Sequence, residues 1–276
     1  MIETSFHIPI TNALHRSSEV LLRYFGRVTN IRVKENLSSV VSEADIESEK
    51  VIIDLITKDF PDHNIISEES GYVYKGSSIT WVVDPLDGTS NFVSGLPWFG
   101  ILIAVMEDFV PIAAGAFLPI GRHLYYAEKS EKTRLNGRLI QVSDSQSPGD
   151  VLIAYSLDYC NDFKETLKET DILANLVNNA RNIRATNCLL DFCYTADGRL
   201  GAAVNHNEKI WDIAAPWLIV KQAGGIVTDT EGKELDFRVN EKNYKKDFPV
   251  IASNGHFHKK LISLINETSN SITRKS

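Results

Sequence analysis

The chain has 276 residues, of which 43% are apolar and 24% charged, proportions typical of a globular protein rather than a disordered or fibrous one. Its 29 lysines and arginines against 36 aspartates and glutamates give a net charge of −7, so we expect no nucleic-acid partner bound through a broad basic face. No apolar run reaches the ~20 residues that span a bilayer, and the N-terminus lacks the segments of a signal peptide, so we expect no membrane partner and a cytoplasmic location.

The first half of the chain predicts two helices followed by strands. Apolar residues at intervals of three and four predict a helix over 10–25, and the capping side chains of 42–45 introduce a second helix that stops before Pro61. Trp81, Val82 and Val83 predict a strand that ends at Asp84-Pro85, because proline removes a donor from the sheet. Antiparallel strands are predicted next, over 99–106, 111–118 and 123–127.

A second half follows the polar segment 133–148, which we expect to cross between the two halves. Its predicted elements are a strand over 151–155, a helix over 163–179, a helical spacing over 189–196, a helix over 211–225 and a strand over 226–228. Helices and strands alternate without repeats, so we predict one domain, residues 1–276, whose halves are about 1–145 and 146–276. The tail after Glu267 is expected to fray.

The densest polar group is the octapeptide Asp84-Pro85-Leu86-Asp87-Gly88-Thr89-Ser90-Asn91, placed where an apolar strand gives way to a turn. A bend there can point both carboxylates and the Leu86 carbonyl to one side, and these are hard oxygen ligands of the kind that Mg²⁺ or Ca²⁺ accepts. The amides of Gly88 and Thr89 would face outward at a helix N-terminus, where phosphate binds. The structural alternative is that Asp87 caps the helix and Asp84 ends the strand.

Two other segments carry acids at the ends of apolar elements. Glu68-Glu69 precedes the strand, and Asp212 begins the helix at Trp211. If these segments converge, each carboxylate pair at ~4 Å repels by up to about 4 kcal/mol at an effective dielectric near 20. A divalent cation would remove that penalty. Spacing alone does not establish the convergence.

Two motifs, in this order, resemble the signatures of the inositol monophosphatase family. They are WVVDPLDGTSNFVSGLPWFGILIAV at 81–105 and WDIAAPWLIVKQAGGIVTD at 211–229, and the acidic pair of SEES at 67–70 lies at a fitting distance. The resemblance covers about 40–253. It implies an α/β (α+β) fold, the layered αβαβα sandwich of the inositol monophosphatase and fructose-1,6-bisphosphatase type.

The same resemblance implies a Li⁺-sensitive phosphomonoesterase that uses two or three Mg²⁺ ions and forms a homodimer. The implied metal ligands are Glu68, Asp84, the Leu86 carbonyl, Asp87 and Asp212. Glu68 and Thr89 are implied to orient the attacking water, with Asp45 supporting Thr89, although Asp45 can equally be a helix N-cap. The implied phosphate and substrate contacts are Asp87, Gly88, Thr89, Cys188, Asn205 and Asp212. Glu69 either orients a neighbouring ligand or faces solvent.

Substrate choice is where the sequence departs from the family pattern. The run Thr186-Asn187-Cys188-Leu189 is bulkier than the family's Gly-Ser/Thr-Ala-Ala, and Asn205 replaces a glutamate that contacts ring hydroxyls in some relatives. Glu208 is close enough that a shifted loop could supply an acid instead. Pro216 stands where the family often has glycine, and we expect it to fit only in the first turn of its helix.

Three hypotheses for function therefore stand. The leading one is Mg²⁺-dependent hydrolysis of a small phosphate monoester, inositol monophosphate by resemblance. The second keeps the metal site but acts on fructose 1,6-bisphosphate, histidinol phosphate or 3'-phosphoadenosine 5'-phosphate, and the third is a non-catalytic relative that binds a protein partner. Histidine takes no part in any of them. The three cysteines, Cys160, Cys188 and Cys193, are predicted to be reduced core residues, with a zinc site as the alternative.

Overall fold

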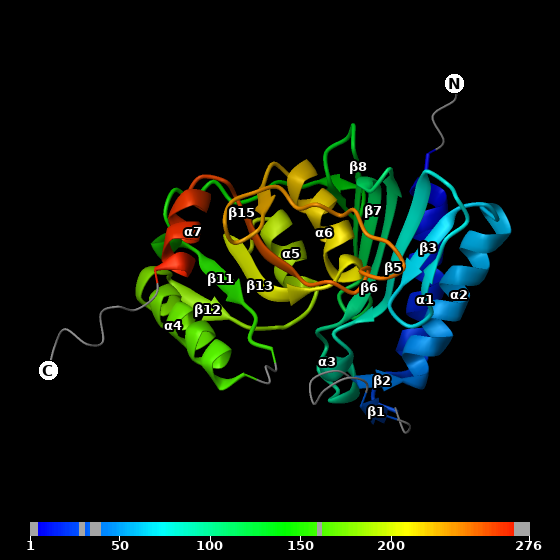
Figure 1. The fold of residues 1–276 in the computed structure, drawn as a ribbon, viewed down its shortest axis with the longest axis horizontal. Coiled ribbons are helices and arrows are strands. Elements are labelled where there is room, and N and C mark those ends of the chain that lie inside the picture. The colour runs from blue at the N-terminus through cyan, green and yellow to red at the C-terminus, as the bar shows by residue number, and fades with distance from the viewer. Residues whose placement is uncertain (1–4, 28–30, 34–39, 159–161, 268–276) are drawn as a thin grey trace, which may run out of the picture.

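The computed structural model describes residues 5–27, 31–33, 40–158 and 162–267, which form five alternating layers of helices and sheets (Figure 1). The outer helices α1 (His7–Tyr24) and α2 (Glu43–Asp59) cover one face of an eight-stranded sheet. The helices α5 (Leu190–Ala196) and α6 (Ile210–Gln222) separate that sheet from a five-stranded one. The last layer comprises α4 (Phe163–Asn179) and α7 (His258–Asn266). The predicted αβαβα sandwich is confirmed.

The first sheet has the strand order β10-β9-β8-β7-β6-β5-β3-β4. Its strands are β3 (Asn64–Ser67), β4 (Gly71–Val73), β5 (Ile79–Asp87), β6 (Gly100–Glu107), β7 (Val110–Leu118), β8 (His123–Glu128), β9 (Arg134–Leu135) and β10 (Arg138–Leu139). Pairing from β5 to β8 is antiparallel, as predicted, whereas β3 lies parallel to β5. β9 and β10 lie in the segment predicted to cross between the halves, so only its later part makes that crossing.

The second sheet has the strand order β12-β11-β13-β15-β14. Its strands are β11 (Leu152–Tyr155), β12 (Asn182–Arg184), β13 (Ala202–Glu208), β14 (Ile226–Thr228) and β15 (Phe248–Ser253). Smaller elements are the pair β1 (Ile31–Val33) and β2 (Val40–Ser42), the short helix α3 (Thr89–Val93) and a 3₁₀ turn at Pro148–Asp150. No helix among the described residues is long and apolar enough to cross a membrane.

The start of α2 follows from its capping side chains. The Ser42 hydroxyl accepts a hydrogen bond from the Ala44 amide at 3.2 Å, and the Ser42 amide donates to the Asp45 carboxylate at 2.7 Å. This reciprocal box satisfies amides that have no partner within the helix. The helix ends ahead of Pro61, as predicted.

Strand β5 does not end at Asp84-Pro85, which corrects the prediction. Asp84 lies opposite Leu102 on β6 and Asp87 lies opposite Gly100, so β5 carries one residue more than its partner over this stretch. Pro85 falls inside this irregularity, where a missing N–H breaks no regular ladder bond. Side chains alternate along a strand, so residues three apart would face opposite sides; the extra residue allows Asp84 and Asp87 to face the same side.

The position of Pro216 also corrects the prediction, because it is the seventh residue of α6 and lies beyond the first turn. Proline has no N–H to donate to the carbonyl of Asp212, four residues earlier. α6 tolerates this loss because it is buried between the two sheets, where the packing of residues such as Leu218 and Ile219 stabilises the helix.

Candidate active site

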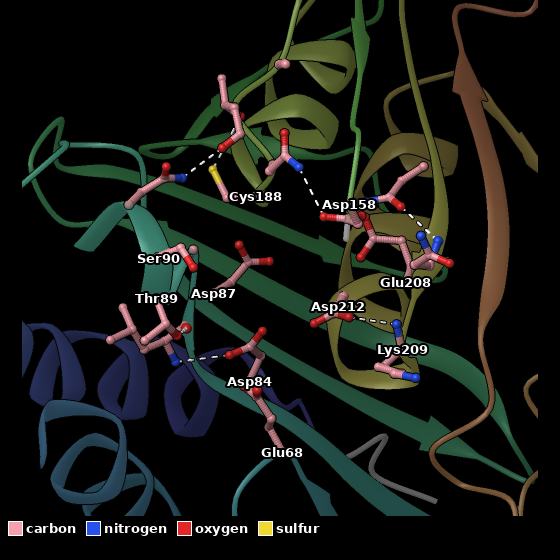
Figure 2. Close-up of a pocket in the computed structure, with 18 of the residues that line it drawn as sticks. Glu68, Asp84, Asp87, Thr89, Ser90, Asp158, Cys188, Glu208, Lys209 and Asp212 are labelled. Atoms are coloured by element: carbon pink, nitrogen blue, oxygen red, sulfur yellow. Dashed lines mark hydrogen bonds between the residues drawn. The ribbon is translucent and has the colours of Figure 1, made fainter. Parts of the chain in front are cut away.

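The acids that the sequence carries on separate segments line one cavity of about 650 Å³ (Figure 2). One carboxylate oxygen each from Asp84, Asp87 and Asp212 lies within 4.8 Å of the others. Glu68 and Leu86 line the same cavity. The structure therefore brings β5, the turn after β3 and the first turn of α6 to one place.

Backbone amides hold the three clustered carboxylates in position. Asp84 accepts a hydrogen bond from the Leu86 amide at 3.0 Å, so the bend in β5 orients its own acid. Asp87 accepts from the Leu189 amide at 2.9 Å, a contact that joins the two halves of the domain. Asp212 accepts from the Lys209 amide at 2.6 Å as part of a capping box at the start of α6.

Glu68 is positioned by a residue that the sequence analysis missed. Glu49, buried in α2, accepts hydrogen bonds from the amides of Glu69 at 3.1 Å and Ser70 at 3.0 Å, and from the Ser67 hydroxyl. This carboxylate therefore fixes the turn that carries Glu68 into the cavity. Nothing in the sequence distinguishes Glu49 from a surface glutamate on a helix. The side chain of Glu69 is not part of the cavity lining.

The cluster is electrostatically unfavourable as it stands. Burial, followed by the charges of the neighbouring acids, raises the pKa of Asp84 and of Asp87 well above the usual range. Burial raises the pKa of Asp212 to about 6, and Asp84 and Asp212 are close enough to hydrogen-bond to each other. Two carboxyl groups in such contact need a proton or a cation between them. Hard oxygen ligands crowded in this way fit a divalent ion such as Mg²⁺.

Thr89 lies beside the cluster and contacts both residues named for it. Its hydroxyl is 3.0 Å from an Asp45 carboxylate oxygen and 2.9 Å from the Leu86 carbonyl, either of which can accept its proton. The other Asp45 oxygen accepts from the Ser42 amide and hydroxyl. The N-cap of α2 is therefore Ser42 and not Asp45, which corrects that alternative; Asp45, at the third position of the helix, accepts from the N-cap residue and from Thr89 at once.

Gly88, the residue before α3, packs too tightly for a side chain. Its φ of +83° lies in the left-handed region, and a Cβ would stand 2.6 Å from the Trp98 carbonyl oxygen and 3.0 Å from the Cys188 Cβ. Cys188 lines the cavity and is only partly buried, so the prediction of a core cysteine is wrong for this residue. Cys193 is buried and free as predicted, and Cys160 lies outside the described residues.

Behind the cavity wall, Asp191 holds the loop that contains Cys188. The Thr186 hydroxyl donates to Asp191 at 2.8 Å, while the Thr186 carbonyl accepts from Asn91 at 2.7 Å. Burial raises the pKa of Asp191 to about 6. Within the described ranges the grouping of side chains able to hold a metal is entirely carboxylate, which argues against the zinc alternative.

The cavity also contains Asn205, one of the positions where the sequence departs from the family pattern, and Glu208, the acid considered as its substitute. Asn205 and Glu208 are three apart on β13, yet both line the cavity, because the pairing of β13 with β15 shifts register between them. No movement of a loop is needed to supply the acid. Other lining residues here are Asp158, Lys209 and Asp247, which the sequence analysis did not single out. No histidine of the described chain lines this cavity.

Comparisons with known proteins agree with this architecture. The profile of the inositol monophosphatase family matches residues 4–270. The fructose-1,6-bisphosphatase/inositol-1-monophosphatase of Thermotoga maritima is 34% identical over 92% of this chain and 93% of its own, and the Nus factor SuhB of Pasteurella multocida is 33% identical over 80% and 83%. The crystal structure of extragenic suppressor protein suhB from Bartonella henselae superimposes with a TM-score of 0.87 at 31% identity, covering 96% of this chain and 99% of that one. The chain belongs to the inositol monophosphatase family.

Proposed function

We propose that the protein is a Mg²⁺-dependent phosphatase that hydrolyses a small phosphate monoester to an alcohol and inorganic phosphate. The observation that carries the proposal is the meeting of Asp84, Asp87 and Asp212 within 4.8 Å in a cavity that also contains Glu68 and Thr89. The names of relatives favour inositol monophosphate as substrate, with fructose 1,6-bisphosphate as the alternative.

The ions would be held by Glu68, Asp84, the Leu86 carbonyl, Asp87 and Asp212. When bound, divalent ions supply Lewis-acid charge that neutralises the phosphate and makes water more acidic. The carboxylates of the protein keep this charge at one end of the cavity. The phosphate would thereby be oriented with its alcohol part toward the side of the cavity beyond Asp212, where Glu208 lies (Figure 2).

Thr89 is the residue best placed to orient the attacking water. When its hydroxyl donates to Asp45 at 3.0 Å, its lone pairs are available to accept a hydrogen bond from water in the cavity. Glu68 accepts the second proton of that water in this proposal. The new bond joins the water oxygen to phosphorus as the bond from phosphorus to the alcohol oxygen breaks. The departing oxygen takes a proton from a second water, and the proton held by Glu68 neutralises the hydroxide that this leaves.

The amides of Gly88 and Thr89 are proposed to bind phosphate oxygens. Gly88 has a positive φ and precedes the first residue of α3, where amides have no partner within the helix. A side chain at Gly88 would also strike Trp98 and Cys188, so glycine allows the turn that presents these amides to pack against them.

Binding of a protein partner is the second candidate function, favoured by relatives that carry the name Nus factor SuhB. The two functions are compatible in one chain. The variant Asp84→Asn distinguishes the phosphatase function from the binding of a partner. It removes a proposed metal ligand while keeping the side-chain shape and its hydrogen bond to the Leu86 amide.

Phosphate release from a panel of substrates tests the proposal. The panel contains inositol 1-phosphate, fructose 1,6-bisphosphate, histidinol phosphate and 3'-phosphoadenosine 5'-phosphate, each assayed with Mg²⁺ and with chelator. We expect Mg²⁺-dependent turnover that Asp84→Asn abolishes. A preference of more than tenfold for a substrate other than inositol 1-phosphate would replace the leading substrate. Full activity of Asp84→Asn with Mg²⁺ would refute the metal site.

A further inference from the structure

We propose that Glu208 and Asp158 form a selectivity site at the alcohol end of the cavity, one that favours monophosphates bearing N–H or O–H donors and rejects a second phosphate. This inference rests on the proposed phosphatase function and adds the class of substrate. The residues concerned lie on the side of the cavity beyond Asp212, away from Thr89 and Ser90 (Figure 2).

The charged side chains that line the cavity are mostly acidic. Seven carboxylates line it, whereas Lys209 is the one cationic side chain among its described lining residues. Four of those carboxylates, Glu68, Asp84, Asp87 and Asp212, are those proposed to hold the ions. The lining acids that remain are Asp158, Glu208 and Asp247, so negative charge extends well past the metal cluster.

Lys209 is already engaged with protein groups. Its ammonium lies 2.5 Å from the Asp247 carboxylate and donates to the Lys245 carbonyl at 3.0 Å. A second phosphate would need a free cation to offset its charge, and paired Lys209 does not supply one. The far end of the cavity therefore offers an anion little electrostatic compensation.

Glu208 faces the cavity without a protein partner. Within the part of the chain that the structure describes, its carboxyl makes no hydrogen bond or ion pair, although the register shift in β13 turns it to the same cavity as Asn205. Burial, then the charges of Asp212, Asp87 and Asp158, raise the pKa of Glu208 well above the usual range. A donor or cation from a ligand would relieve this cost, whereas a second phosphate would increase it.

Asp158, the second acid of the proposed selectivity site, lies in the segment that follows β11. Asn187 donates to one Asp158 oxygen at 3.1 Å and so fixes the carboxylate beside the cavity. Asp158 is close enough for its charge to act on Glu208. An amine or several hydroxyls could hydrogen-bond to both acids, so an amino-alcohol phosphate or a polyol phosphate fits this end.

Steady-state kinetics with Mg²⁺ on three phosphates tests the inference: histidinol phosphate carries an amine, inositol 1-phosphate carries neutral hydroxyls, and fructose 1,6-bisphosphate carries a second phosphate. We expect kcat/KM for the better monophosphate to exceed that for the bisphosphate by at least about 30-fold, mostly through KM. The double variant Glu208→Gln/Asp158→Asn should reduce this ratio at least about tenfold. Asp247→Asn should also reduce it, because it frees the ammonium of Lys209.

Glu234→Gln is the matched control, since Glu234 is 82% exposed and pairs with Lys221 away from the cavity. It should leave the ratio unchanged. A wild-type ratio below about threefold, or a double variant that keeps the full ratio, overturns the inference while the phosphatase proposal stands. If none of the three, nor 3'-phosphoadenosine 5'-phosphate, is hydrolysed, the phosphatase proposal fails. Calorimetric binding of the same three compounds then decides the selectivity, and equal affinities would overturn it.

Discussion

Replacing Asp84 with asparagine should make the metal-free protein more stable while abolishing its phosphatase activity. Asparagine keeps an oxygen that can accept from the Leu86 amide, which now lies 3.0 Å from Asp84. Its amide group can donate to Asp212, which the aspartate can do only when protonated. The substitution therefore removes charge with little change of shape.

The size of the gain follows from the distances within the cluster. Oxygens of Asp84, Asp87 and Asp212 lie within 4.8 Å of one another, and two full charges at that distance repel by roughly 3.5 kcal/mol at an effective dielectric of 20. Burial adds a separate cost, since it raises the pKa of Asp212 from 3.8 to about 6, which corresponds to about 3 kcal/mol against the charged form. Shared protons relieve part of this repulsion, so we expect a net gain of about 2 kcal/mol in unfolding free energy at pH 8.

Thermal unfolding at pH 8 with chelator measures this gain, and an increase in melting temperature of roughly 3–4 °C is expected for a chain of this size. Added Mg²⁺ should raise the melting temperature of the wild type, since it binds the folded state, and should raise that of the variant much less. Asp54→Asn, an exposed change on α2, should alter neither value. A metal-free variant less stable than the wild type would refute the repulsion argument.

Three further outcomes are expected. Gly88→Ala should cost about 2–4 kcal/mol in chemical denaturation, because its Cβ would stand 2.6 Å from the Trp98 carbonyl at a φ of +83°; a neutral result would contradict the close packing. Burial raises the pKa of Asp191 from 3.8 to about 6, so the folded state binds the proton of this carboxyl more tightly than the unfolded state does. Up to about 3 kcal/mol of unfolding free energy, fully present below pH ~4, should therefore be lost as the pH rises through 6. Asp191→Asn should remove this loss from the pH dependence of the unfolding free energy. An unchanged pH dependence would argue against the raised pKa of Asp191. Thr89→Val should lower kcat by about 10² or more, whereas Thr89→Ser should retain most activity; equal rates for the two would show that the hydroxyl bonded to Asp45 is dispensable.

Local signals predicted much of the fold. The helix over 163–179 has the predicted bounds because Asp162 caps it and its pattern is uninterrupted, and the strand over 226–228 follows two glycines that end α6. Strands β6, β7 and β8 of the first sheet were predicted within one or two residues, since apolar runs separated by turn residues define them. Strands β13 and β15 and helix α7 were not predicted.

The errors lie where tertiary contacts override a local rule. β5 continues through Pro85 because the sheet accommodates an extra residue there, and Pro216 lies inside α6 because both neighbouring sheets bury that helix. No single-sequence rule reveals either compensation.

For the candidate site, the acids themselves were visible in the sequence, but what positions them was not. The motif around Asp84 and Asp87 marked the acidic cluster because it concentrates acids beside a glycine. Glu49 fixes the turn of Glu68 from a distant helix, and Glu208 reaches the cavity through a register shift in β13. Such contacts depend on how strands pair, which the order of residue types does not specify.

Asp84, Asp87 and Asp212 are proposed to hold divalent metal together, and the phosphatase activity depends on it. A crystal structure grown with Mn²⁺ and inorganic phosphate tests it most directly, because Mn²⁺ can be located by its anomalous scattering. We predict anomalous peaks among these carboxylates, about 2–2.5 Å from their oxygens, with phosphate beside Thr89. Ions bound elsewhere, with the three carboxylates turned away from one another, would contradict the account.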